Sequence, residues 1–273
     1  CINGLIPFSH SGTLSGSLRV FGRETKEMSL FELSKKVGTV LQDADGQFIG
    51  LTVGEDIAFA LENDAVPRGA MREKVRATAL SVGVEKHLAH APHEMSGGQK
   101  QRVSLAGVLV DDVKLLLFDE PLANLDPAAG RQAIEMIDEV HKRLGVTVVI
   151  VEHRIEDVLH RPVDRIVLMD EGRIVADGAP DEMLACSLLR DLGIREPLYV
   201  TALGYAGVPV TPGMRPRAIG TLVLSEDQKA AVRRWFEGAP PAPEKALGEA
   251  LLEVQTVDFS YANGCEALKD VNL

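Results

Sequence analysis

Three short, mostly apolar segments, separated by longer segments with helical periodicity, constrain this chain more than any other feature of its sequence. They span residues 37–41, 113–118 and 147–151, and the last is rich in β-branched residues. Apolar segments of this length are typical of strands buried on both faces of a parallel sheet. Helices between such strands provide the crossover connections that parallel pairing needs. The sequence therefore predicts an α/β fold with a largely parallel sheet over residues 1–185.

The segments between these strands carry the signals of helix ends. Asp126 is a favourable N-cap, Pro127 follows it at the first helical position, and Gly145 stands where a helix would stop. Proline just inside the start and glycine just past the end are characteristic of helices. Three helices and a hairpin are expected, over residues 70–82, 97–110, 127–144 and 165–176.

The composition changes after residue 185. Residues 186–246 hold seven of the 14 prolines, which predicts a linker or accessory segment. From Leu251 a new strand pattern begins, and a turn is expected at Asn263. We therefore expect three parts: a first unit at 1–185, a linker or accessory segment at 186–246, and the opening strands of a second unit at 247–273.

Charge and hydropathy narrow the range of partners. The chain has 29 Lys and Arg against 40 Asp and Glu, a formal net charge of −11, which argues against general binding to nucleic-acid backbones. No segment approaches the roughly 18 consecutive apolar residues that a membrane helix needs. Three scattered cysteines favour a reducing compartment over a disulfide framework. We expect no nucleic-acid partner, whereas docking on a membrane protein stays open.

Polar residues follow each of the three predicted strands. Gln42 follows the first, Asp119 and Glu120 end the second, and Glu152 and His153 follow the third. In open α/β sheets, ligands bind beyond the carboxyl ends of the strands. These side chains are therefore expected along one edge, where together they can hold a metal, a water and an anion.

The adjacent carboxylates of Asp119 and Glu120 suggest a division of tasks. Neighbouring side chains on an extended strand point in opposite directions, so the two cannot do the same work. One can face Mg²⁺, which prefers carboxylate and water oxygens, and the other can act as a general base, a role worth about 10²–10⁴ in rate. Taken alone, the pair favours two solvated acids. The residue type of Glu152 indicates no role.

Residues 96–99 predict a helix start that is open to an anion. Ser96 is a good N-cap, and Gln99 three residues later completes a capping box. Gly97 and Gly98 leave backbone N–H groups uncovered at the positive end of the helix. A plain capped helix is the alternative, and this segment alone does not decide between the two.

In this order, the motifs resemble those of the nucleotide-binding subunit of ATP-binding cassette (ABC) transporters. The resemblance rests on residues 96–102 (SGGQKQR), 115–121 (LLLFDEP), 123–127 (ANLDP) and His153, and it covers nearly all of residues 1–185. It implies a P-loop NTPase-like ABC cassette with a helical signature subdomain that uses ATP and Mg²⁺.

The resemblance also implies roles for single residues. Asp119 would hold Mg²⁺ with Gln42, Glu120 would activate the attacking water, and His153 would contact the γ-phosphate. Gln42 would also link the site to a membrane partner. The residues assigned to nucleotide contacts across a pair of cassettes are Ser96, Gly97, Gly98, Gln99, Asp126 and, in the second unit, Tyr261.

One element of the resemblance is absent. The phosphate-binding pattern G-x-x-x-x-G-K-[ST] does not occur, and no glycine is followed by lysine. The resemblance places this Walker A loop just before residues 2–5 and, for the second unit, just after Leu273. We therefore expect a fragment that lacks the loop, binds ATP weakly or not at all by itself, and is inactive alone.

We expect an ATPase subunit that powers solute transport with paired cassettes, at the cytoplasmic face of the cell membrane. Its partners would be the transmembrane subunits of a transporter and a second cassette. The order Glu-His-Arg at 152–154 is similar to the ATPase of energy-coupling-factor importers, which take up vitamins or metal ions.

The alternative is a soluble twin-cassette factor acting on ribosomes, disfavoured because residues 186–246 are not strongly basic. A DNA-repair ATPase head would need long coiled coils, and no sustained heptad pattern is visible.

A separate pattern of three histidines, His87, His90 and His93, invites interpretation as a metal site. Pro92 interrupts the helix that would align them. We favour a surface turn before the glycine-rich helix start.

Overall fold

The computed structural model describes the chain except for residues 11, 44, 124, 241–249, 263 and 265. The expected turn at Asn263 and the loop residue Asn124 therefore lie outside the described residues. The chain forms two compact units, Cys1–Val232 and Arg233–Leu273, which are described separately. The boundaries expected at residues 185 and 246 stay a prediction.

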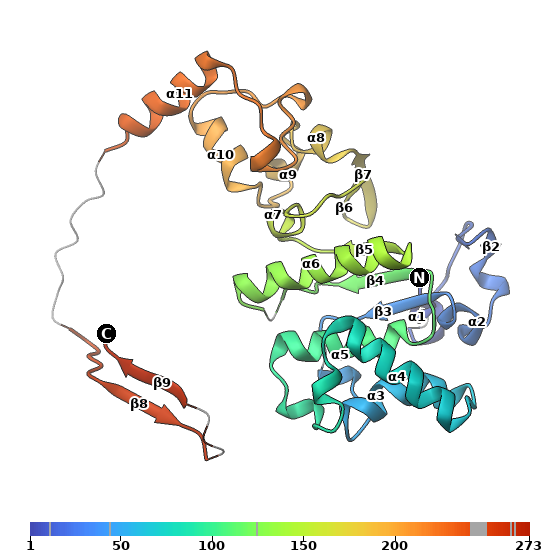
Figure 1. Ribbon diagram of the computed structural model, residues 1–273. Coiled ribbons are helices and arrows are strands. Elements are labelled where there is room, and N and C mark those ends of the chain that lie inside the picture. Colours follow the sequence, from blue (N-terminus) through green and yellow to red (C-terminus); the bar gives the residue numbers. More distant parts are fainter. Residues whose placement is uncertain (11, 44, 124, 241–249, 263, 265) are drawn as a thin grey trace. The chain divides into compact units, whose positions relative to one another are not determined.

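The first unit alternates helices and strands along the chain (Figure 1). Its strands are β1 (Arg19–Val20), β2 (Arg23–Glu24), β3 (Val37–Val40), β4 (Leu115–Asp119), β5 (Thr147–Val151), β6 (Ile166–Asp170) and β7 (Arg173–Gly178). Its α-helices are α1 (Leu5–Phe8), α2 (Leu30–Ser34), α3 (Val53–Asn63), α4 (Arg68–Val82), α5 (Gly97–Leu109), α6 (Pro127–Leu144), α7 (Ile155–Val158), α8 (Pro180–Met183), α9 (Leu188–Asp191) and α10 (Leu198–Tyr205).

The three apolar segments form a parallel sheet in the order β3-β4-β5, as the sequence predicts. Val40 lies opposite Phe118, and Asp119 lies opposite Val151. The three strands therefore end nearly level, and the residues that follow them lie along one edge of the sheet.

The main core joins this sheet to its helices. Leu116 and Phe118 of β4 are almost fully buried and belong to one apolar cluster with residues of α3, α4, α5 and α6. Within α6, Ile134 and Ile137 contribute to this core, because apolar residues at this spacing share one face of a helix. The helices α3 to α5 lie together in Figure 1 and pack against one another.

The predicted C-terminal ends of α4 and α6 are confirmed. Gly83 after α4 and Gly145 after α6 both have left-handed backbone conformations, with φ of 76° and 63°. Glycine adopts this conformation without a Cβ penalty, which explains why each helix stops there.

Residues 155–232 add two smaller cores to the first unit. One surrounds the predicted hairpin, which is confirmed as β6 paired with β7. The other packs Leu203, Val208 and Met214 together, and the hydroxyl of Tyr199 donates to the carbonyl of Pro216 at 2.7 Å. The proline-rich segment is thus folded as far as residue 232.

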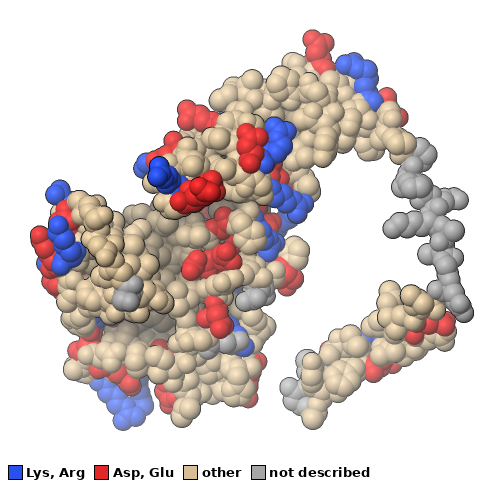
Figure 2. Space-filling view, turned by 180° about the vertical axis from the view of Figure 1, so that it is seen from behind, with Lys and Arg blue, Asp and Glu red and all other residues tan. Residues whose placement is uncertain are grey.

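The helix α11 (Glu226–Glu237) spans the boundary between the two units, and the second unit also holds the antiparallel strands β8 (Val257–Ser260) and β9 (Glu266–Val271). Every residue of both strands is exposed. In the described part of the chain, no helix is long and apolar enough to cross a bilayer. On the face shown in Figure 2, acidic and basic side chains are interspersed.

Candidate functional site

Three predicted site residues meet at the edge where β3, β4 and β5 end. Nε2 of Gln42 donates to Oε2 of Glu120 at 2.8 Å, and Nδ1 of His153 is 3.9 Å from Oε1 of Glu120. The side chains of Glu120 and His153 are 36% and 66% exposed. This group, which we call the strand-end cluster (Gln42, Glu120 and His153), is open to a ligand from solvent.

The backbone turns sharply between the two carboxylates. Asp119 is the last residue of β4, whereas Glu120 has a φ of 45°, a conformation that is uncommon for a residue with a Cβ atom. The N–H of Glu120 still donates to the carbonyl of Val151 at 2.9 Å. The expectation of an extended strand through both residues is therefore wrong at Glu120, because the backbone leaves the extended conformation there.

Asp119 offers oxygen ligands for a cation. Its side chain is exposed at the end of β4, and no described residue hydrogen-bonds to or pairs with it. A carboxylate with free oxygens fits a hydrated Mg²⁺. Among the described residues, no group of three His, Cys, Asp or Glu could hold a metal ion. A metal ion held by Asp119 and Gln42, as predicted, would therefore need ligands in addition to His, Cys, Asp and Glu side chains.

Glu152 is a buried member of the site that the residue types did not reveal. Its side chain is only 2% exposed. Oε1 accepts the N–H groups of His153 and Arg154 at 3.0 and 3.1 Å, and Oε2 accepts the N–H of Leu122 at 3.3 Å. Side chains alternate between faces along a strand. Exposure alternates along β5 in the structure, and this alternation continued by one residue points Glu152 inward. The uniformly apolar residues 148–151 give no such signal in the sequence.

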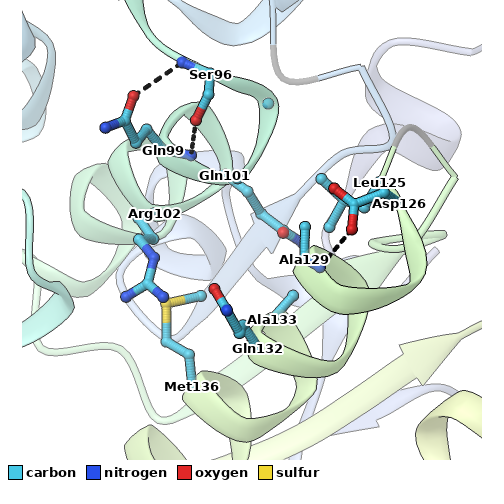
Figure 3. Close-up of a pocket in the computed structure, with 12 residues that line it drawn as sticks. Ser96, Gln99, Gln101, Arg102, Leu125, Asp126, Ala129, Gln132, Ala133 and Met136 are labelled. Atoms are coloured by element: carbon cyan, nitrogen blue, oxygen red, sulfur yellow. Dashed lines mark hydrogen bonds between the residues drawn. The ribbon is translucent and has the colours of Figure 1, made fainter. Parts of the chain in front are cut away.

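A second group of predicted residues lines a hollow of about 260 Å³ between the start of α5 and the start of α6. Figure 3 shows Ser96 and Gln99 on one side of it and Asp126 and Ala129 on the other. The lining residues are Ser96, Gly97, Gly98, Gln99, Gln101, Arg102, Leu125, Asp126, Ala129, Gln132, Ala133 and Met136. We call this the helix-start pocket.

Both helix caps in this pocket have the predicted form. Oγ of Ser96 accepts the N–H of Gln99 at 3.4 Å, while Oε1 of Gln99 accepts the N–H of Ser96 at 2.9 Å. Oδ1 of Asp126 accepts two N–H groups at the start of α6, at 2.9 and 3.0 Å. Ser96 and Gly97 are exposed, so the start of α5 is accessible to an anion.

Gln101 connects the pocket to the strand-end cluster. It is buried in α5, and its Nε2 donates to the carbonyl of Pro121 at 2.9 Å. Pro121 directly follows Glu120, so the same turn is held by the glycine-rich helix. Reasoning from residue types missed this contact, because a glutamine on a helix gives no indication of a partner 20 residues away.

Two other residues considered in the sequence analysis, His87 and Tyr261, lie outside the strand-end cluster. Nε2 of His87 is 3.3 Å from Nε2 of Gln99, so this histidine contacts the capping box. Tyr261 lies in the second unit, 58% exposed, with its ring centroid 5.2 Å from that of Phe259. Its predicted adenine contact stays a prediction.

Comparison with known families assigns most of the chain. Residues 7–123 match the family described as ABC transporter. Residues 186–259 match the family described as ATP-binding cassette cobalt transporter.

Known relatives agree with these matches. A putative ABC transporter ATP-binding protein of Vibrio parahaemolyticus is 53% identical over 272 residues, covering 100% of this chain and 47% of the relative. One from Clostridium perfringens is 52% identical, covering 100% of this chain and 48% of the relative. The chain thus spans about half the length of the curated relatives it matches. Among solved structures, cbiO1 of C. perfringens, described as part of the ABC transporter complex cbiONQ, is 33% identical with a TM-score of 0.56, over 64% of this chain and 70% of that one.

Proposed function

The chain belongs to the family of ABC transporter ATP-binding proteins, and from this premise we propose that the complete gene product binds and hydrolyses ATP to power solute transport. The observation that carries the proposal is the strand-end cluster. An amide, a carboxylate and an imidazole meet there within hydrogen-bonding range or close to it. Phosphoryl transfer to water requires mainly positioning and charge stabilisation, which these groups supply.

Each residue of the cluster has a distinct task in this proposal. Glu120 orients or deprotonates the attacking water, and its hydrogen bond from Gln42 holds the carboxylate in place. His153, mostly exposed beside it, contacts the terminal phosphate. Asp119 and Gln42 hold Mg²⁺, which neutralises phosphate charge when bound.

The helix-start pocket supports a role for a second cassette. The start of α5 is exposed at Ser96 and Gly97 and would clamp the phosphates of ATP bound on an opposing cassette. Replacing Ser96 by Arg fills this approach with a long cationic side chain. We expect Ser96→Arg to prevent ATP-driven pairing of cassettes, measured by analytical ultracentrifugation or cross-linking. Pairing at the wild-type level would contradict the clamp.

The solute is proposed to be a metal ion or a vitamin. This is supported by the family matched at residues 186–259, whose description names a cobalt transporter, and by cbiO1, described as part of a transporter complex. Ile49 and Leu51, 64% and 83% exposed in the loop after Gln42, are suited to dock on transmembrane subunits at the cytoplasmic face of the membrane.

Replacing Glu120 by Gln in the complete gene product tests the ATPase proposal. The amide preserves the shape of the side chain but is a far weaker base, so we expect turnover to fall by about 10²–10⁴ while ATP remains bound. Steady-state phosphate release and filter binding of labelled ATP measure the two quantities. Glu139→Gln, which neutralises an exposed acid on α6, is the matched control. Wild-type turnover in Glu120→Gln would refute the assignment of the base.

A further inference from the structure

We propose that Glu152 and Arg154 form a clamp on the main chain of Leu122 that positions His153 for its contact with phosphate. The inference rests on the proposed ATPase function and assigns a positioning role to Glu152. The clamp joins two segments of the chain, the loop after β5 and the turn after Glu120.

The clamp binds both main-chain polar groups of Leu122, its N–H and its carbonyl. Oε2 of Glu152 accepts the N–H of Leu122 at 3.3 Å, and Nη1 of Arg154 donates to the carbonyl of Leu122 at 3.1 Å. Arg154 is itself held by Asp157 at 2.7 Å. Since residues 152 and 154 flank His153, the histidine is anchored from both sides to the turn that begins at Glu120.

Burial makes this arrangement difficult to break. The side chain of Glu152 is 2% exposed, and that of Leu122 is completely buried. A buried carboxylate deprived of its donors is costly, whereas one that accepts several main-chain N–H groups is well satisfied. A displacement of the His153 loop away from Leu122 would leave the carboxylate with fewer donors, so the two segments move together.

The clamp also orients the imidazole ring. Nδ1 of His153 is 3.3 Å from Oε1 of Glu152 and 3.9 Å from Oε1 of Glu120. Because carboxylates only accept, Nδ1 carries the proton when it faces them. This leaves Nε2 as the ring nitrogen available to a ligand on the exposed side.

A purely structural staple is the competing explanation, and the two differ in how their effects combine. If Glu152 acts through His153, removing both side chains is no worse than removing His153 alone. If Glu152 only stabilises the fold, its loss adds to the loss of His153, because independent effects on activity multiply.

The experiment compares Glu152→Ala, His153→Ala and the double variant in the complete gene product. We expect Glu152→Ala to lower kcat by roughly 10- to 100-fold, the size seen when groups that orient metal-binding residues are removed, with little change in KM for ATP. In the His153→Ala background, Glu152→Ala should lower kcat by less than about twofold. Glu156→Ala is the control, because Glu156 also accepts a distant main-chain N–H, that of Leu198 at 3.0 Å.

If Glu152→Ala does not fold, Glu152→Gln is measured in its place. Its carbonyl oxygen can still accept from His153 and Arg154, but its amide group then meets the N–H of Leu122 as a second donor. The inference is overturned if the folded variant has the kcat of the Glu156→Ala control, or if the losses at residues 152 and 153 multiply.

Hydrogen exchange at the Leu122 amide separates failure of the clamp from failure of the proposed function. A wild-type protein without ATPase activity would refute the proposed function. The clamp itself predicts slow exchange at Leu122 that accelerates at least tenfold in Glu152→Ala or Glu152→Gln. Equal exchange in wild type and variant would refute the clamp whether or not ATP is hydrolysed.

Discussion

The substitution Ser96→Ala separates a nucleotide contact from an ordinary helix cap. Ser96 caps α5 through a bond of 3.4 Å to the N–H of Gln99. The reciprocal bond, from the N–H of Ser96 to Oε1 of Gln99 at 2.9 Å, does not use the hydroxyl and survives the substitution. An exposed cap with one long bond lies at the low end of the usual range, so Ser96→Ala should reduce the free energy of unfolding by about 0.5 kcal/mol.

The proposed function requires a much larger effect on activity. A hydrogen bond from a hydroxyl to a charged phosphate contributes about 1.5–3 kcal/mol. If this bond forms only in the paired state that hydrolyses ATP, its loss lowers turnover by about 10- to 100-fold. The expected signature is therefore a large loss of turnover with a Tm lowered by only about 1–2 °C.

The chain contains a matched control for this substitution. Ser29 caps α2 with the same capping box, its Oγ accepting the N–H of Glu32 at 3.1 Å. The cap bond is shorter than that of Ser96, so Ser29→Ala should reduce stability at least as much. Ser29 lies outside the helix-start pocket, so Ser29→Ala should leave turnover unchanged.

Steady-state ATPase assays and thermal unfolding of both variants of the complete gene product provide the comparison. Turnover in Ser96→Ala equal to that in Ser29→Ala, with similar Tm values, would show that Ser96 is only a cap. The reasoning about the start of α5 would then be refuted, although the strand-end cluster would be unaffected.

Two further predictions concern stability. A Cβ added at Gly38 would lie 2.0 Å from Cγ1 of Val108, so Gly38→Ala should destabilise the fold by about 1–3 kcal/mol. Gly69→Ala is the control: a Cβ there meets nothing within 4 Å, so this variant should preserve or raise the Tm. Burial, followed by the nearby carboxylates of Glu156 and Asp181, raises the pKa of Tyr199 to about 12. The unfolded chain therefore loses this proton first, and stability should fall as the pH rises from about 10 towards 12. Tyr199→Phe should remove that fall in urea unfolding curves, at the expense of about 1 kcal/mol at neutral pH for the lost bond to Pro216.

The parts of the fold that the sequence predicted are those determined locally or by simple topology. The strands were identifiable from their short apolar segments, and the ends of α4 and α6 because Gly83 and Gly145 suit a left-handed residue. The expected burial on both faces is wrong for β5, where Val149 and Val151 are 39% and 58% exposed. The meeting of Gln42 with Glu120 followed from parallel strands ending at one edge. None of these inferences required knowledge of contacts between distant side chains.

The features that were not predicted depend on such contacts. The left-handed backbone of Glu120 is imposed by the turn around it, because residue type gives a glutamate no preference for that conformation. The bonds from Gln101 to Pro121 and from Leu122 to Glu152 join segments 20 and 30 residues apart. Sequence periodicity can indicate that a polar residue points inward, but it cannot identify the main-chain group that the residue meets.

The turn at Glu120–Leu122 contacts both halves of the candidate site. Glu120 belongs to the strand-end cluster, and the carbonyl of Pro121 accepts a hydrogen bond from Gln101, which lines the helix-start pocket. Glu152 accepts the N–H of Leu122. This short segment is therefore bonded to both α5 and the His153 loop. If the proposed phosphate contact of His153 holds, its loss would either shift this turn relative to α5 or break the bonds to Leu122.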